Sequence, residues 1–125
     1  MKRVIGIGNA LTDMLVNLSS DEVLERYNIA RGSMSLVDSK LQSEVSKAVA
    51  GRPYSLSLGG SADNTIRAMA RLGADVGFIG KVGRDTTGDF FEQALSNLGI
   101  HPVIFRGENR SGKCVSLISP HGERT

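Results

Sequence analysis

Residues 59–100 read GGSADNTIRAMARLGADVGFIGKVGRDTTGDFFEQALSNLGI, and this stretch decides the fold class. A glycine pair leads into a helical pattern that Gly73 ends, and the apolar run VGFIG at 76–80 is typical of a short buried strand. A second amphipathic pattern covers 87–98 and ends at Gly99. Because strand and helix patterns alternate, the sequence predicts an α/β fold with a doubly wound core.

Extended segments outside this stretch predict a second, smaller sheet. Residues 2–8 form an apolar run closed by glycine, which suits a further buried core strand. We assign four other strand-like segments to the small sheet, and these are 13–18, 33–37, 103–106 and 113–119. The last two are predicted to form a hairpin across a Gly/Asn/Ser turn. The whole of 1–125 is expected to belong to one domain, which is the size that its length allows.

Composition narrows the classes of function. Fifteen Lys and Arg against thirteen Asp and Glu give a net charge of +2, and the basic residues are scattered, which argues against nucleic acid or an anionic membrane as partner. The sequence has no apolar run near the roughly 20 residues of a membrane span and no signal-peptide pattern, so we expect a cytoplasmic protein. Cys114 is the one cysteine, and no Cys/His cluster has metal-ligand spacing, so no metal site is predicted.

The segment GIGNALTD at 6–13 begins like a dinucleotide-binding loop. That fingerprint needs a third glycine where this chain has Leu11, which disfavours a Rossmann-type oxidoreductase. Asn9 and Asp13 instead follow the carboxyl end of a predicted core strand, where ligands of open α/β sheets bind. A carboxylate can accept hydrogen bonds from two hydroxyls and an amide can donate and accept, so the pair suits a vicinal diol. The alternative is that both side chains stabilise local turns.

A second constellation precedes the first predicted helix of the stretch. Gly59 and Gly60 allow the backbone to approach a ligand, and the helix start leaves unpaired N–H donors beside them. Asn64 lies one turn into the helix, and helical side chains lean toward the amino terminus, so its amide is expected to reach the same ligand. The alternative is a flexible Gly-Gly joint before an ordinary helix, with Asn64 exposed to solvent.

Taken together, these motifs resemble the amino-terminal signature of the ribokinase (PfkB-type) family, which includes ribokinase, fructokinase and adenosine kinase. The matching positions, in order, are Gly59, Gly60, Asn64, Leu72, Gly73, Gly80, Val82, Gly83, Asp85, Gly88, Leu98, Gly99 and Ile100. GNALTD at 8–13 resembles the family's substrate-contacting strand end, and SGKCVSLISPHGERT at 111–125 resembles its lid hairpin. These two segments lean toward the adenosine-kinase-like members.

The resemblance implies a ribokinase-like core, present in part, with a small β-sheet lid over a sugar or nucleoside. The activity it implies is ATP-dependent phosphorylation of a hydroxyl of that small molecule. By position, Asp13, Gly60 and Asn64 match residues that hold substrate hydroxyls, with Asn9 and Gly59 beside them.

Further positions follow from the same resemblance. Arg124 matches a basic residue near the transferred phosphate in adenosine-kinase-like members, and the alternative is an exposed arginine. Lys81, Gly83 and Asp85 fall where contacts at the pocket edge and in a structural turn are expected. The lid sheet forms a dimer interface in some relatives, so a homodimer through this sheet is a further expectation.

The catalytic segment of the family has no counterpart in these residues. That segment is a glycine-rich G-A-G-D run which supplies an anion hole and the base that takes the hydroxyl proton, and no such run occurs here. We therefore expect no catalytic or metal-binding residue in this chain, with ATP and Mg²⁺ bound mainly by other sequence. The 125 residues are expected to be an inactive part of a longer kinase. Two other hypotheses are a non-catalytic sugar- or nucleoside-binding or regulatory module and the disfavoured oxidoreductase.

Overall fold

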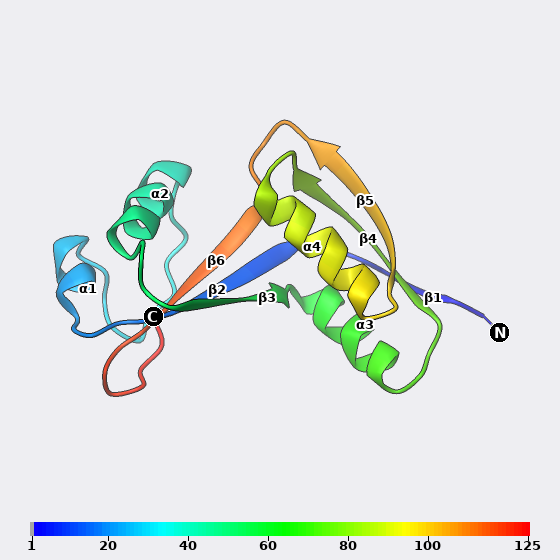
Figure 1. The fold of residues 1–125 in the computed structure, drawn as a ribbon, viewed down its shortest axis with the longest axis horizontal. Coiled ribbons are helices and arrows are strands. Elements are labelled where there is room, and N and C mark those ends of the chain that lie inside the picture. The colour runs from blue at the N-terminus through cyan, green and yellow to red at the C-terminus, as the bar shows by residue number, and fades with distance from the viewer. Residues whose placement is uncertain (1) are drawn as a thin grey trace. The chain divides into compact units, whose positions relative to one another are not determined.

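The computed structural model describes residues 2–125, and this chain forms two compact units (Figure 1). The first unit consists of the described part of Met1–Asp13 together with Ser57–Cys114, and the second consists of Met14–Leu56 and Val115–Thr125. The elements in chain order are β1 (Val4–Ile7), β2 (Leu11–Asn17), α1 (Glu22–Arg26), α2 (Ser39–Ala48), β3 (Tyr54–Gly59), α3 (Ser61–Arg71), β4 (Val76–Gly83), α4 (Thr86–Asn97), β5 (His101–Gly107) and β6 (Gly112–Ile118).

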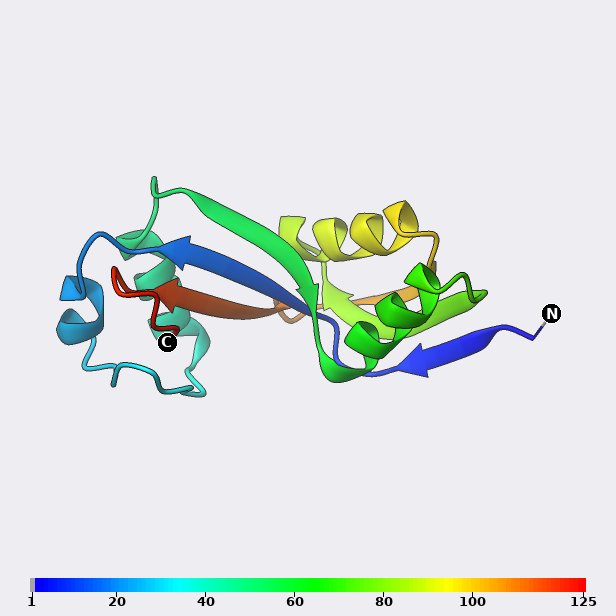
Figure 2. The ribbon, with the colours of Figure 1, turned by 90° about the horizontal axis from the view of Figure 1, so that it is seen from below.

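A parallel sheet with the strand order β1-β4-β5 forms the centre of the first unit. Helices α3 and α4 pack against it from one side (Figure 2). Phe78 of β4 is fully buried, and its ring lies 5.8 Å from that of Phe91 on α4. On α3, Ile66 packs into the same core. The buried residues of this core are Ala10, Leu58, Ile66, Val76, Phe78, Val82, Phe91, Leu95 and Ile100.

The other side of this parallel sheet is apolar and exposed. Side chains alternate along a strand, so Ile79 points away from the helices that its neighbour Phe78 contacts, and the register places Ile7 beside Ile79. Ile7 is 72% exposed and Phe105 of β5 is 59% exposed. Because parallel sheets are normally covered on both faces, this is an unusual surface for water to contact. We call Ile5, Ile7, Ile79 and Phe105 the open sheet face.

The second unit has its own core, in which α1 and α2 take part. Its buried residues are Val16, Leu18, Val23, Leu24, Val45, Val49 and Leu117. The Asp38 side chain caps α2 by accepting a hydrogen bond from the Leu41 N–H at 2.8 Å. At the carboxyl end of the chain, Leu117 and Thr125 exchange two backbone hydrogen bonds of 2.8 and 2.9 Å.

A second sheet has the strand order β3-β2-β6. In Figure 2 the arrows of β2 and β6 point the same way and the arrow of β3 points the opposite way, so this sheet is mixed. Two of its strands confirm predicted segments, since β2 overlaps 13–18 and β6 overlaps 113–119. Strand β3 was not predicted.

Two other predictions for the small sheet are wrong. Segment 33–37 contains no strand, and the side chains of Met34 and Leu36 are 95% and 104% exposed. Segment 103–106 lies within β5, which pairs in parallel with β4 instead of forming a hairpin with β6. The turn residues between β5 and β6 indicated a hairpin locally, but β4 supplies a buried partner strand that a local pattern cannot reveal.

Candidate functional site

The carboxylate of Asp13 lies directly against Gly59. Asp13 is the third residue of β2 and is half-buried, and Gly59 ends β3. A Cβ added at Gly59 would stand 2.7 Å from Oδ1 of Asp13, which is closer than side-chain carbons approach an oxygen. A side chain at position 59 would therefore push the carboxylate out of its present position. Because Asp13 lies in a strand, the alternative that it caps a turn is not supported.

The neighbouring Gly60 is required for two reasons. Its φ of +99° lies where side chains are strained, and a Cβ added there would stand 2.6 Å from the backbone oxygen of Asn9. Gly60 is also the N-cap of α3, and its carbonyl accepts the Asn64 N–H at 2.9 Å. Gly60 thus contacts the backbone of both Asn9 and Asn64. Both asparagine residues are exposed.

All five predicted substrate-binding residues meet in the first unit, where the turn before β2, the end of β3 and the first turn of α3 come together. The arrangement offers a carboxylate acceptor, two side-chain amides and the amino-terminal end of an eleven-residue helix. Arg124 belongs to the second unit, where its Nε donates to the Ser116 hydroxyl at 3.0 Å. Its role near a phosphate stays a prediction.

Sequence reasoning missed Asp63 and Arg67, which lie next to these residues on α3. The Arg67 Nε donates to Oδ2 of the fully buried Asp63 at 2.9 Å. Burial raises the pKa of the Asp63 carboxyl, and the guanidinium of Arg67 opposes this rise only in part. An acid four residues before an arginine is the signal that could have pointed to this pair.

Asp85 joins the end of β4 to the loop that precedes β6. Its carboxylate caps α4 by accepting the Gly88 N–H at 2.8 Å, and it also accepts the Ser111 N–H at 2.9 Å and the Ser111 hydroxyl at 2.6 Å. Burial acts to raise the pKa of Asp85, but the hydrogen bonds from Ser111 and Gly88 outweigh it and hold this pKa below its ordinary value. The expected structural-turn role of Asp85 therefore has a physical basis.

Asp85→Asn is expected to lower the free energy of unfolding by about 1–3 kcal/mol, because charge-assisted hydrogen bonds and an N-cap are weakened. A lowered folded-state pKa adds stability above the unfolded-state pKa of about 3.9, and this contribution is lost as the pH falls through the folded-state pKa. Urea unfolding at a series of pH values should therefore show a smaller acid loss in the variant. The control is Asp75→Asn, which removes only an exposed ion pair with Arg3. Equal acid limbs in wild type and Asp85→Asn would contradict this account.

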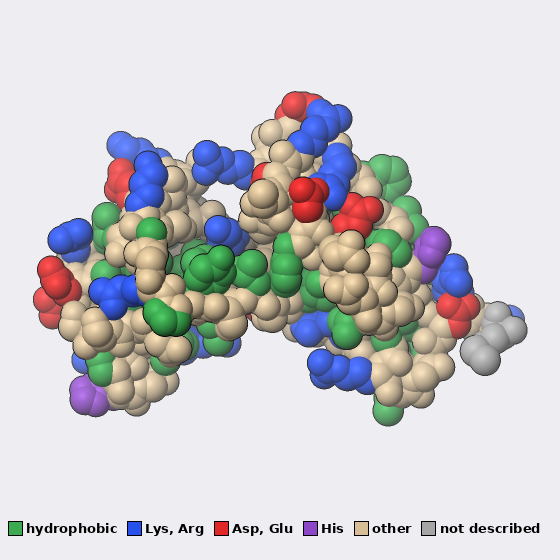
Figure 3. Space-filling model, in the orientation of Figure 1, with side chains coloured by type: hydrophobic (Ala, Val, Ile, Leu, Met, Phe, Trp, Pro, Cys, Tyr) green, Lys and Arg blue, Asp and Glu red, His purple; other side chains and the backbone are tan. Residues whose placement is uncertain are grey.

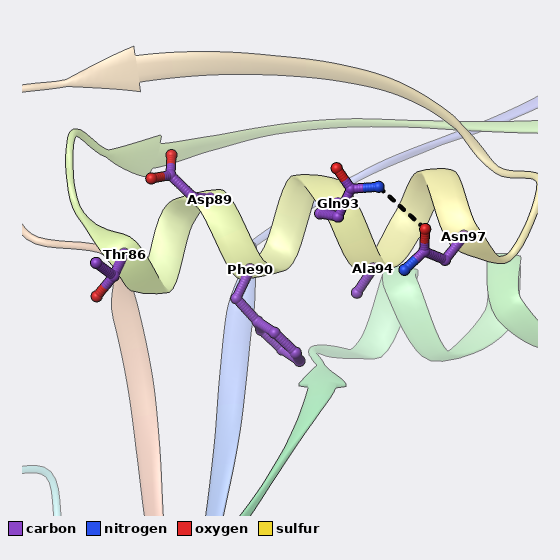
Figure 4. A pocket seen from close by; sticks show the side chains of 6 residues that line it. All are labelled: Thr86, Asp89, Phe90, Gln93, Ala94 and Asn97. Carbon is purple, nitrogen blue, oxygen red and sulfur yellow. Dashed lines mark hydrogen bonds between the residues drawn. The ribbon is translucent and has the colours of Figure 1, made fainter.

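Two hollows on the first unit lie apart from the five predicted residues. One, of about 460 Å³, runs along α4 and is shown in Figure 4, where Gln93 donates to Asn97 at 3.0 Å. The other, of about 580 Å³, lies toward the carboxyl ends of β1, β4 and β5, and it is lined by three residues of the open sheet face together with Gly8, Gly80, Lys81 and Arg106. Arg106 is already paired with Asp89. Neither hollow gathers unpaired groups that would define a reaction.

The charge distribution of the surface and the side-chain clusters say little about the function. Acidic and basic side chains are intermixed on the face seen in Figure 3. Within residues 2–125, no group of three or more His, Cys, Asp or Glu side chains is placed to hold a metal ion. Over the same residues, none of the helices has the length and apolar character needed to cross a membrane.

The sequence model of the pfkB family of carbohydrate kinases matches residues 26–125. The chain belongs to this family. The resemblance seen in the sequence is therefore confirmed, and so is the α/β fold with a partial ribokinase-like core.

Several relatives of this pfkB family chain are sugar kinases by name. A 5-dehydro-2-deoxygluconokinase of Clostridium botulinum is 33% identical over 85 residues, which are 68% of this chain and 24% of that protein. A 5-dehydro-2-deoxygluconokinase of Clostridium beijerinckii is 49% identical over 67 residues, which are 50% of this chain and 20% of that protein. The chain thus spans about a quarter of the length of such curated relatives.

Among solved structures, the pfkB family chain is similar to the adenosine kinase of Sinorhizobium meliloti. The two are 28% identical with a TM-score of 0.77, and the match covers 97% of this chain and 37% of that one. Relatives by sequence and by structure are therefore kinases of sugars and of nucleosides, which is the class that the sequence predicted.

Proposed function

We propose that this chain is the substrate-binding part of an ATP-dependent kinase that phosphorylates a hydroxyl of a sugar or nucleoside. The observation that carries the proposal is the half-buried Asp13 carboxylate, which lies against Gly59 beside the first turn of α3. A carboxylate so placed can accept hydrogen bonds from ligand hydroxyls, and Asn9 and Asn64 add amides within the same cluster. Membership of the pfkB family supports the reaction class.

The described residues do not fit ATP and Mg²⁺ as a resident pair. No cluster of metal-ligating side chains occurs within 2–125, and the glycine-rich anion-hole segment of the family is absent from the sequence. We assign no residue of this chain to either group, apart from the predicted phosphate contact of Arg124. The chain's own contribution is to hold and orient the acceptor hydroxyl.

The substrate class is open between sugars and nucleosides. The curated relatives named above are 5-dehydro-2-deoxygluconokinases, whereas the solved structure named above is an adenosine kinase. A polyol contact at Asp13 suits either class, because both present neighbouring hydroxyls. Homodimerisation through the lid sheet stays a prediction.

The test is to express the protein from its complete reading frame and to measure ADP formation from ATP with a panel of acceptors. The panel should contain adenosine, D-ribose, D-fructose and 5-dehydro-2-deoxygluconate. We expect ADP formation that depends on one acceptor, and we expect the 125 residues expressed alone to give none. Acceptor binding without phosphorylation by the complete protein would identify a binding or regulatory module instead. If the complete protein neither binds nor phosphorylates any of these acceptors, the proposal is wrong.

A further inference from the structure

Arg67 connects three parts of the candidate site. Its Nε donates to Oδ2 of Asp63 at 2.9 Å, and its Nη2 donates to the Leu58 carbonyl oxygen at 2.9 Å and to Oδ1 of Asn64. Leu58 immediately precedes the glycine pair, and Asn64 is a predicted substrate contact. One guanidinium, 20% exposed, therefore ties the end of β3 to the first turn of α3.

The contact with Arg67 determines which way the Asn64 amide faces. A guanidinium carries five N–H donors and no acceptor, so only the oxygen of an amide can face it. The amide orientation of asparagine is often ambiguous, but beside an arginine donor it is not. With Oδ1 of Asn64 occupied by Arg67, the NH₂ group of this exposed side chain is turned away from the guanidinium.

Stability alone does not explain the Asp63–Arg67 pair. Asp63 is fully buried, and within residues 2–125 its Oδ1 has no hydrogen-bond partner. An unpartnered carboxylate oxygen in the interior is unfavourable, and buried ion pairs often add little to the free energy of unfolding. The pair therefore places an energetic cost immediately beside the glycine pair and Asn64. Such a cost is expected where geometry serves function.

We propose that Asp63 and Arg67 are positioning residues that turn the Asn64 amide so that it presents N–H donors to the substrate. The proposal rests on the proposed function, because it takes Asn64 and Asp13 as substrate contacts. Asn64 then donates to a substrate oxygen, whereas Asp13 accepts from a substrate hydroxyl. The two positions differ in specificity as a result. A hydroxyl, ether or carbonyl oxygen satisfies Asn64, but only a hydroxyl satisfies Asp13.

The restraint that Arg67 places on the Asn64 amide can be tested without any ligand. In the ¹⁵N-labelled protein from its complete reading frame, we expect the order parameter of the Asn64 side-chain amide to be near that of rigid backbone, about 0.85, and to fall below about 0.6 in Arg67→Met. Arg71→Met, which removes an exposed arginine in the last turn of the same helix, is the control and should leave the value unchanged. An unchanged order parameter in folded Arg67→Met overturns the proposal.

The consequence for binding is tested in the protein from its complete reading frame, with adenosine and D-fructose as probes. Arg67→Met is expected to weaken binding of the accepted probe about tenfold, since one hydrogen bond to the substrate loses its alignment. Arg67→Lys should restore part of this loss, because one ammonium can still donate to Asn64. A purely structural role would not give this rescue at equal stability.

A second variant separates contact from positioning. Asn64→Asp keeps an acceptor for Arg67 but has no N–H to donate, so it should lose as much affinity as Asn64→Ala while the chain stays folded. If the wild type binds a probe and Arg67→Met binds it equally well, the positioning role is wrong. If the wild type binds neither probe nor any other acceptor of the panel above, the proposed function fails, and the order parameter of Asn64 still decides whether Arg67 restrains the amide.

Discussion

Asp13→Asn in the protein from its complete reading frame is expected to weaken substrate binding tenfold or more while the affinity for ATP stays almost unchanged. The variant keeps the shape of the side chain but removes its negative charge and one acceptor oxygen. Hydrogen bonds to a charged group contribute about 1.5–3 kcal/mol each, which corresponds to roughly tenfold or more in the dissociation constant. Calorimetric titration of the accepted substrate and of ATP measures both affinities.

The control for Asp13→Asn is Asp89→Asn, which changes a largely exposed carboxylate paired with Arg106. It should leave substrate affinity unaltered, because Asp89 lies on α4 away from the glycine pair. Equal affinity of Asp13→Asn and wild type for the substrate would remove Asp13 from the site.

Gly60→Ala is expected to destabilise the first unit and to abolish measurable substrate binding. The alanine would hold a φ of +99°, and its Cβ would stand 2.6 Å from the Asn9 backbone oxygen, which cannot swing aside as a side chain can. The backbone at Asn9 and the start of α3 must then move apart. Since these two segments carry the Asn9 and Asn64 side chains, the free energy of unfolding and the affinity for substrate should fall together.

Gly73→Ala is the matched control, because Gly73 also has a positive φ, +86°, but a Cβ there would meet nothing within 4 Å. It should lower the free energy of unfolding by about 1–2 kcal/mol through backbone strain alone. Urea unfolding measures the free energy of unfolding of both variants. Gly73→Ala reports backbone strain alone, whereas Gly60→Ala reports backbone strain together with the close contact to Asn9. If Gly60→Ala is no less stable than Gly73→Ala and still binds substrate, the tight contact with Asn9 has no role.

The core of the first unit could be predicted because its signals are local. The buried run at 76–80 and the glycine that ends each helix identify β4, α3 and α4 without reference to distant residues. The pairing of β5 could not be predicted in this way. Its partner β4 is separated from it by a whole helix, whereas a turn pattern beside it suggested β6. Pairing depends on which strand offers a buried neighbour, and that is a property of the assembled sheet.

The candidate site, too, could be predicted from the sequence only in part. The glycine pair and Asn64 could be found from residue types and spacing, and the structure adds why each glycine is needed, through Asp13 and Asn9. The orienting contact of Arg67 could not be found in that way. An acid–arginine spacing on a helix usually indicates an exposed ion pair, and only the burial of Asp63 distinguishes this one.

The open sheet face has a practical consequence for every binding measurement on the 125-residue chain. Ile7 and Phe105 offer exposed apolar surface on one side of the parallel sheet, and we expect such a surface to self-associate as concentration rises. Association would hide part of the chain from ligand and distort an apparent dissociation constant. Titrations should therefore be run at several protein concentrations and accompanied by light scattering. Self-association through the open sheet face is then not mistaken for a low affinity for the ligand.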